Sequence, residues 1–258
     1  MFGNGFDFKM GSIEKMIHKN AKNGKKMHFA LIDPDLRKLS LEQITSRCKT
    51  LQKWGTDVIL VGGSTHFTRQ NVEDVVDTIH NSCKIPVVLY PSKPEALTNK
   101  ADGILFMSLL NSKDPFWIAG AQSSTSQWVK GSGLQILPMT YLVVHPGMTV
   151  GKVGKADLIK PGQNEKAVGY SLAAQYFGFR LVYLEAGSGA TKPVPVEMVS
   201  AVRNAIDIPL IVGGGIRTAE QAKERLDAGA DVIVTGTAIE QDMERHEAVV
   251  KMIKNYRR

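Results

Sequence analysis

A carboxylate directly before a glycine-rich turn is the clearest chemical signal in the sequence. Glu185 ends the apolar run 181–185, and the segment 186–189 (Ala-Gly-Ser-Gly) follows it. Tyr183 stands two residues earlier, so in a strand its side chain and that of Glu185 point to the same side. A carboxylate in this place can act as a general base or bind a substrate hydroxyl. The alternative is a structural acid paired with a lysine or an arginine.

Two further glycine-rich segments follow apolar runs near the end of the chain. The segment 212–216 reads Val-Gly-Gly-Gly-Ile, and the segment 235–239 reads Thr-Gly-Thr-Ala-Ile. Glycine lets the backbone approach a phosphate closely, and the amides at a following helix N-terminus favour its negative charge. The two segments together predict a phosphate site. The alternative is that these glycines only turn the chain.

Hard oxygen ligands follow the first two apolar runs. Asp33 comes after the run 27–32, and Pro34 fixes the turn that presents it. A carboxylate beside a phosphate site suggests Mg²⁺. Ser64 offers a hydroxyl after Gly63, although a role as the N-cap of a helix is an equal alternative for this serine.

Other kinds of site find little support. His28, His66 and His145 have no metal-ligand spacing, and neither a G-x-S-x-G elbow nor a G-x-G-x-x-G fingerprint is present. Nucleic acid is not an expected partner, because only the net charge of +7 would favour it, with no aromatic-basic motif. The two cysteines, Cys48 and Cys83, are far apart and fit a reducing cytoplasm.

The elements that must position these residues repeat along the chain. Residues 54–63 resemble residues 228–237, which indicates a recurring strand-helix unit. Eight short apolar runs without alternation are typical of strands buried on both faces. They cover residues 27–32, 57–61, 86–90, 103–107, 140–144, 181–185, 209–212 and 231–235. With helical stretches between them, they predict a single (β/α)₈ TIM barrel, whose active site lies on the loops after the strands.

No linker divides the chain, whose 258 residues are close to the ~250 typical of this fold. We expect one domain, 1–258, with residues 1–26 as an N-terminal helical extension. The segments 123–126 and 130–133 are expected to be short polar loops. No signal peptide and no apolar run of the ~20 residues that span a bilayer is visible, so a cytoplasmic location is expected.

The motifs Ile-Asp-Pro-Asp (32–35), Val-Gly-Gly-Ser (61–64), Leu-Tyr-Pro-Ser (89–92), Tyr-Leu-Glu-Ala-Gly-Ser-Gly (183–189) and Val-Gly-Gly-Gly-Ile (212–216) together resemble the geranylgeranylglyceryl phosphate synthase family. The resemblance runs from about residue 26 to 240, and the 183–189 string joined to Asp-Pro-Asp is its most specific part. It implies a prenyltransferase that joins sn-glycerol 1-phosphate to geranylgeranyl diphosphate through an ether bond. The family releases diphosphate and uses Mg²⁺.

The resemblance also implies roles for individual residues. Asp33 and Ser64 would hold Mg²⁺, and Glu185 would accept the proton of the glycerol 3-hydroxyl. Glycerol phosphate would lie on Tyr183, Leu184, Glu185, Ala186, Gly187, Ser188, Gly189, Gly213, Gly214, Gly215, Gly236 and Thr237. One branch of the family carries a lysine where this chain has Leu31, so this chain cannot make the phosphate contact of that lysine. In this respect the chain resembles the other, longer branch.

Apolar residues after the fourth run could form a trench for the prenyl chain, or they could be ordinary core. They are Phe106, Met107, Leu109, Leu110, Phe116 and Trp117, of which the last two look loop-borne and more available to a ligand. A homo-oligomer is expected. Lysines cluster at 19–26 and 152–166. They could be ordinary solvated surface, or they could attract phosphate-bearing substrates or make transient contact with an anionic membrane surface.

Two other classes of function stay open at this point. One is another phosphate-handling barrel enzyme, such as an isomerase, an aldolase or an FMN-dependent oxidoreductase. The other is a catalytically silent phosphate-binding subunit.

Overall fold

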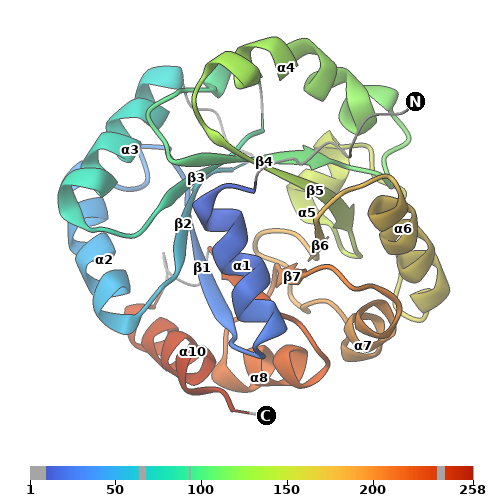
Figure 1. Cartoon of the computed structure of the whole chain (residues 1–258). Helices are drawn as coiled ribbons and strands as arrows, with labels where there is room; N and C mark the ends of the chain where they lie inside the picture. Colours follow the sequence, from blue (N-terminus) through green and yellow to red (C-terminus); the bar gives the residue numbers. More distant parts are fainter. Residues whose placement is uncertain (1–9, 64–67, 93, 237–241, 258) are drawn as a thin grey trace.

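Eight parallel strands close into a barrel in chain order, with β1 paired to β8 (Figure 1). The structure is a computed structural model, and it describes residues 10–63, 68–92, 94–236 and 242–257. The strands are β1 (Met27–Ile32), β2 (Val58–Gly62), β3 (Val87–Tyr90), β4 (Gly103–Ser108), β5 (Gln135–Val143), β6 (Leu181–Glu185), β7 (Leu210–Gly213) and β8 (Val232–Thr235). The predicted TIM barrel is confirmed.

Helices surround the barrel, except α1, which lies across the end where the strands begin (Figure 1). They are α1 (Ser12–Lys22), α2 (Leu41–Trp54), α3 (Arg69–Ser82), α4 (Ala121–Gly131), α5 (Met148–Val153), α6 (Asn164–Tyr176), α7 (Val196–Ala205), α8 (Ala219–Asp227) and α10 (Met243–Asn255), with the short turns η1 (Pro94–Ala96) and η2 (Phe116–Gly120). None of the described helices is long and apolar enough to cross a membrane.

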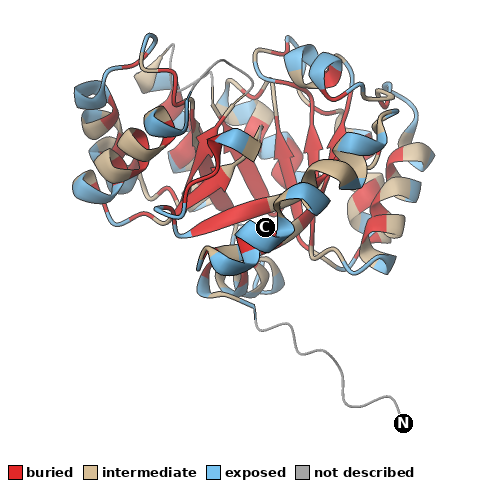
Figure 2. Ribbon diagram, turned by 90° about the horizontal axis from the view of Figure 1, so that it is seen from above, coloured by how far each residue is buried: buried red, intermediate tan, exposed pale blue. Residues whose placement is uncertain are grey.

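The core has two layers because successive side chains of a strand point to opposite faces. One set fills the barrel interior, and the other packs under the surrounding helices. Figure 2 shows this arrangement, with buried strands inside and helices that are buried only on their inner faces. Along β6, Tyr183 belongs to the interior set and Leu184 to the helix-facing set. Glu185, one residue further, therefore returns to the interior side.

Helix α1 closes the end of the barrel where the strands begin. Ile13 and Ile17 are buried among the interior side chains. The backbone N–H of Ile13 donates to Oε1 of Gln135, the first residue of β5, at 2.9 Å. Glu14, 1% exposed, pairs with Arg180, which directly precedes β6. A ligand can therefore enter the barrel only from the opposite end, where the strands finish.

We expect Ile17→Ala to lower the free energy of unfolding by about 2–5 kcal/mol, the usual cost of emptying a packed site. Activity at low temperature should persist, because Ile17 lies at the end away from the loops that follow the strands. Denaturant unfolding checks this, with Lys19→Ala on the exposed face of the same helix as the control. An unchanged unfolding midpoint for Ile17→Ala would show that α1 does not hold the barrel closed.

Two expectations about the middle of the chain were wrong. The fifth strand begins at Gln135 instead of residue 140, since Pro138 and exposed Ile136 hide its start in the sequence. Segment 123–126 is helical and belongs to α4, which also includes residues 130 and 131. The hydroxyl of Thr125 donates to the carbonyl of Ala121 at 2.9 Å, and that of Ser126 to Gln122 at 2.6 Å. The hydroxyl groups of this serine- and threonine-rich segment therefore find hydrogen-bond acceptors within the helix itself.

Candidate active site

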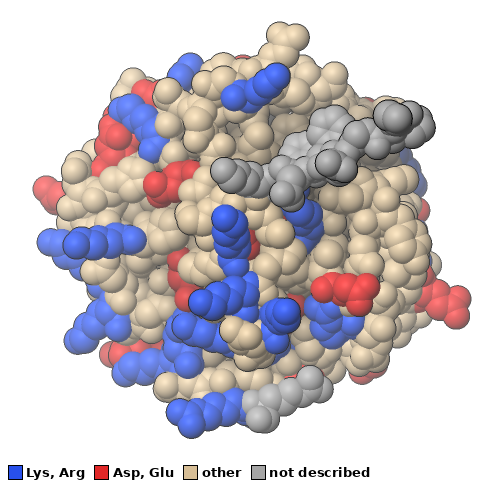
Figure 3. Space-filling view, viewed as in Figure 1, with Lys and Arg blue, Asp and Glu red and all other residues tan. Residues whose placement is uncertain are grey.

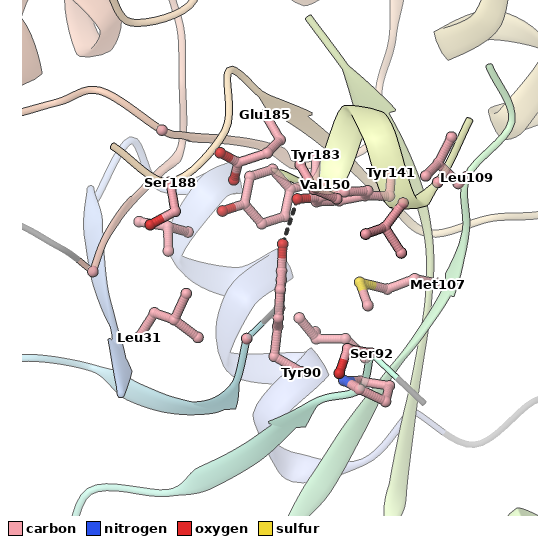
Figure 4. A pocket seen from close by; sticks show the side chains of 18 of the residues that line it. Leu31, Tyr90, Ser92, Met107, Leu109, Tyr141, Val150, Tyr183, Glu185 and Ser188 are labelled. Carbon is pink, nitrogen blue, oxygen red and sulfur yellow. Dashed lines mark hydrogen bonds between the residues drawn. The ribbon is translucent and has the colours of Figure 1, made fainter. Parts of the chain in front are cut away.

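A cavity of about 580 Å³ opens where the strands end (Figure 4). On one side it is bounded by residues of β6 and of the loops after β6, β7 and β8: Tyr183, Glu185, Ser188, Gly189, Gly214, Gly215, Arg217 and Gly236. On the other side it is bounded by apolar residues of β4, η2 and α5 and their surroundings: Leu97, Ile104, Leu105, Phe106, Met107, Leu109, Trp117, Val150 and Val153. The cavity thus joins a polar, glycine-rich wall to an apolar one.

Glu185 stands at the junction of the two walls and is 6% exposed. Its Oε1 accepts a hydrogen bond from the backbone N–H of Gly187 at 2.6 Å. Burial raises the pKa of this carboxyl above its ordinary value, and hydrogen bonds from Tyr183, Gly187 and Tyr141 act against the rise. In the described part of the chain, no lysine or arginine contributes to this pKa. The carboxylate is therefore held in place yet retains a raised affinity for a proton, as a general base requires.

Three tyrosines line the cavity beside Glu185. The hydroxyl of Tyr90 donates to that of Tyr141 at 2.5 Å, as the dashed line in Figure 4 marks. The rings of Tyr141 and Tyr183 meet edge to face, with centroids 5.1 Å apart. Burial and the negative charge of Glu185 raise the pKa of all three hydroxyls. All three remain protonated at neutral pH; Tyr141 and Tyr183 hydrogen-bond to the carboxylate, and Tyr90 donates to Tyr141.

The glycine loops after β6 and β7 pack directly against Glu185. Gly214 has φ +82°, and a Cβ there would lie 2.3 Å from Oε1 of Glu185 and 2.6 Å from the nitrogen of Gly187. A Cβ on Gly213 would lie 2.3 Å from the hydroxyl oxygen of Tyr183. Only glycine leaves room at these two positions. The loops are thus brought against the carboxylate and form the polar wall of the cavity.

The structure places the sequence-predicted residues of this wall in two groups. Tyr183, Glu185, Ser188, Gly189, Gly214, Gly215 and Gly236 line the cavity. Gly187 and Gly213 lie immediately behind it, against Met148 and Tyr183 respectively. Leu184 and Ala186 point into the helix-facing core, so a substrate could meet only their backbone. Thr237 lies outside the described residues.

Asp33 follows β1 at the edge of the same mouth. Its Oδ1 accepts from the backbone N–H of Asp35 at 3.1 Å, and its Oδ2 from Nζ of Lys38 at 3.0 Å. A Cβ on Gly63 would contact the carboxylate of Asp33 at 3.4 Å, so the loops after β1 and β2 meet here. Ser64 lies outside the described residues.

The oxygen ligands near Asp33 suit a metal ion whose remaining ligands come from a bound substrate. The described residues contain no group of three or more His, Cys, Asp or Glu side chains that could hold a metal alone. Mg²⁺ is commonly held by one or two carboxylates together with phosphate oxygens and water. Asp33 fits such a site, since its pairing with exposed Lys38 leaves its side chain partly open at the mouth. Asp35 is more buried and is held by two hydrogen bonds from Arg37, which lowers the pKa of that carboxyl to about 2.

The six apolar residues considered for a trench divide unequally. Phe106, Met107, Leu109 and Trp117 line the cavity. Leu110 packs into the helix-facing core. Phe116 is 43% exposed and lies edge to face on Trp117, with ring centroids 5.1 Å apart. The expectation that Phe116 and Trp117 lie on a loop was wrong, because both belong to η2.

Sequence reasoning gave Tyr90 of β3 only as part of a family motif, and it missed Tyr141 of β5 and the apolar residues of α5. Tyr141 pairs with Tyr183 in the parallel register, so the two side chains share a face. An alignment of the fifth and sixth apolar runs could have revealed this pairing. Val150 and Val153 carried no such signal, because nothing in the sequence turns the short helix α5 toward the cavity.

The fold and this site define a class: a TIM-barrel enzyme with its active site at the carboxyl ends of the strands. The model of the PcrB family matches residues 19–255, and the chain belongs to this family. It is 48% identical over 245 residues to the geranylgeranylglyceryl phosphate synthase of Pyrococcus abyssi, a match that covers 95% of this chain and 96% of the relative.

Solved structures agree with this assignment. One is the crystal structure of (S)-3-O-geranylgeranylglyceryl phosphate synthase from Thermoplasma acidophilum in complex with its substrate sn-glycerol-1-phosphate. It is 41% identical, has a TM-score of 0.91, and the match covers 96% of this chain and 100% of that one. The wild-type enzyme from Thermoplasma volcanium is 43% identical with a TM-score of 0.88, covering 94% and 96% of the two chains.

Proposed function

We propose that this protein transfers a geranylgeranyl group from its diphosphate to sn-glycerol 1-phosphate and forms an ether bond. The observation that carries the proposal is the position of Glu185, between a glycine-rich wall and an apolar wall of one cavity. One substrate is a small phosphate ester with a hydroxyl, and the other has a long hydrocarbon chain. The two walls match these two chemistries.

Glycerol phosphate is assigned to the loops after β6, β7 and β8. The proposed contacts are residues 183–189, Gly213, Gly214, Gly215, Gly236 and Thr237, with backbone amides facing the phosphate. The related enzyme of Thermoplasma acidophilum holds sn-glycerol-1-phosphate, which supports this choice of substrate. The prenyl chain is assigned to the apolar wall, which includes Phe106, Met107, Leu109, Trp117, Val150 and Val153. The volume of about 580 Å³ is within the ~300–1,000 Å³ range of small-molecule sites.

The reaction needs one proton acceptor and one leaving group. Glu185 takes the proton from the glycerol 3-hydroxyl, whose oxygen forms a bond to C1 of the prenyl group. The bond from C1 to the diphosphate oxygen breaks, and its electron pair leaves with the diphosphate. Tyr141 and Tyr183 orient the carboxylate by hydrogen bonds, so the proton acceptor is held in place before the substrate arrives.

Mg²⁺ is proposed as the cofactor, held through Asp33 with Ser64 as a second ligand. When bound, the ion would neutralise the diphosphate and make it a better leaving group. Asp33 supports this assignment because its carboxylate stands at the mouth beside the loop after β2.

Tyr141→Phe should shift the acidic limb of the pH profile of kcat/KM to higher pH. The substitution removes a hydrogen bond that lowers the pKa of Glu185, so the carboxyl takes up its proton at a higher pH. Glu185 can accept a proton only when it is deprotonated, so a higher pKa moves the acidic limb to higher pH. Tyr176→Phe, at an exposed position on α6, is the control. An unmoved limb would exclude Tyr141 from setting the pKa of the base.

Incubation with sn-glycerol 1-phosphate, Mg²⁺ and prenyl diphosphates of several lengths, followed by mass analysis, tests the proposed function. We expect one prenylglyceryl phosphate and one diphosphate per turnover, and no prenyl product without glycerol phosphate. Simple hydrolysis of the prenyl diphosphate, or no reaction with any chain length, would overturn the proposal. A yellow flavin in the purified protein would favour an FMN-dependent enzyme instead.

We further propose that the protein acts in the cytoplasm as a homo-oligomer. The location is supported by the sequence, whose two cysteines form no disulfide framework; Cys48 and Cys83 are buried and lie within hydrogen-bonding reach of each other. Tyr176 and Phe177, at the end of α6, are 77% and 73% exposed, and adjacent exposed aromatic side chains are typical of an interface. Light scattering of the purified protein measures the assembly.

A further inference from the structure

The outer side of the apolar cavity wall carries exposed hydrophobic side chains. We define the rim as residues 113–117 and 148–160, which include η2 and α5. Phe116, Met148 and Val153 on this rim are 43%, 38% and 51% exposed. Trp117 and Val150, from the same two elements, line the cavity on the inner side, and Val153 borders both the cavity and solvent. The rim is therefore a thin wall, with the cavity behind it and solvent in front.

The two parts of the rim are joined into one surface. The backbone N–H of Lys113 donates to the carbonyl of Lys155 at 3.0 Å. The hydroxyl of Ser112 donates to the carbonyl of Gly154 at 2.6 Å, and Nζ of Lys155 contacts the carboxylate of Asp114 at 2.8 Å. Phe116 and Val153 are thus held at the same edge of the mouth.

Positive charge accompanies these apolar side chains. The rim and the first turn of α6 contain five lysines and three acids, a net charge of +2. They are Lys113, Lys152, Lys155, Lys160 and Lys166 against Asp114, Asp157 and Glu165. Lys152 and Lys160 are exposed, and Lys160 attracts the carboxylate of Asp157 without a close contact, whereas the other three lysines form ion pairs with Asp114 or Asp157. Exposed apolar residues among lysines in net excess over acids are the composition of an interfacial membrane anchor.

We propose that the rim docks on an anionic lipid bilayer, with Phe116, Met148 and Val153 in the interface and the lysines on the headgroups. The proposal rests on the proposed function for its purpose, because a prenyl chain that resides in the bilayer would enter the cavity across this edge. A second copy of the chain fits the rim poorly. In a two-fold dimer the same positive surface would face itself.

The opposite end of the barrel provides a comparison. Figure 3 shows lysines gathered over α1, which closes the barrel where the strands begin. Lys15, Lys19, Lys22 and Lys25 are exposed there. These four lysines exceed the net charge of +2 at the rim, but they lie away from the cavity mouth. If attraction depended on net charge alone, the α1 face would bind anionic vesicles at least as strongly as the rim.

Sedimentation with vesicles of equal parts phosphatidylcholine and phosphatidylglycerol tests the proposal. The rim variant combines Lys113→Gln, Lys152→Gln and Lys160→Gln, and the matched control combines Lys19→Gln, Lys22→Gln and Lys25→Gln. Both remove three charges. We expect the rim variant to partition about tenfold to a hundredfold more weakly than the parent chain at low salt. The control should change much less.

Phe116→Gln examines the apolar part of the contact, with Trp128→Gln on α4 as the control, because Trp128 is an aromatic residue of similar exposure that lies outside the rim. The first substitution should weaken the binding that persists at high salt, and the second should not. Phe116 does not line the cavity, so turnover of detergent-solubilised substrate should remain normal. Circular dichroism confirms that each variant is folded.

Three outcomes would overturn the docking surface: no vesicle binding by the parent chain, equal losses from the two lysine variants, or dissociation of an oligomer by Phe116→Gln. The last would assign the rim to a second copy. Failure of the proposed function is distinguishable, because it would abolish product formation in detergent while vesicle binding through the rim persisted.

Discussion

Glu185→Gln lowers kcat by about 10²- to 10⁴-fold, the usual contribution of a positioned general base. The amide keeps the shape of the side chain and can still accept the hydrogen bond from the nitrogen of Gly187. It cannot take the proton of the glycerol hydroxyl. Affinity for glycerol phosphate, measured by calorimetry, should change much less than kcat. A variant with near-normal kcat and lost affinity would make Glu185 a binding residue only.

Unfolding of the same variant separates lost catalysis from lost structure. The pKa of Glu185 is raised in the folded state, so ionisation at neutral pH opposes folding. The stabilising effect of this group is complete below its unfolded pKa and disappears as the pH rises through the folded one. Glutamine carries no charge, and the variant should be at least as stable as the parent chain at pH 7. A lower unfolding midpoint would indicate that the carboxylate has a structural role.

Asp33→Asn reduces activity by about a hundredfold or more, because an amide oxygen is a weak ligand for Mg²⁺ and the ion contributes several kcal/mol to such reactions. Removal of divalent cations with EDTA should have a similar effect on the parent chain and should be reversed by added Mg²⁺. The control is Asp77→Asn, which removes the same charge from an exposed position on α3.

The kinetic assay of Asp33→Asn is run at saturating glycerol phosphate, so that only the diphosphate side of the site is measured. Binding of Mg²⁺ with inorganic diphosphate, followed by calorimetry, should weaken in the same variant. Full activity of the parent chain in excess EDTA would contradict the assignment of the metal. Activity retained by Asp33→Asn but lost in EDTA would transfer the metal to other ligands.

The barrel and its polar wall could be predicted from the sequence because both depend on local patterns. Buried parallel strands are short apolar runs, and a glycine loop after such a run lies at the mouth wherever the run is placed. The alternation along Tyr183, Leu184 and Glu185 therefore predicted from the sequence that the carboxylate lies on the interior side, as the structure shows. The apolar wall has no comparable pattern.

Residues of the apolar wall depend on tertiary placement that the sequence does not encode locally. Tyr90 and Tyr141 meet only because β3, β4 and β5 pair in a particular register. Phe116 and Trp117 are neighbours of similar chemistry, yet η2 turns one to solvent and the other into the cavity. The serine and threonine hydroxyls of α4 donate hydrogen bonds to carbonyls of their own helix. From composition alone, a segment rich in serine and threonine is predicted to be a loop.

The central claim is that the oxygen of the glycerol 3-hydroxyl attacks C1 of the prenyl group and displaces diphosphate. The most direct measurement uses sn-glycerol 1-phosphate labelled with ¹⁸O at the 3-hydroxyl, and mass analysis of both products. We predict that the label is found entirely in the ether oxygen of the prenylglyceryl phosphate and that the released diphosphate contains none. Label in the phosphate product, or an ether oxygen without label, would contradict the account.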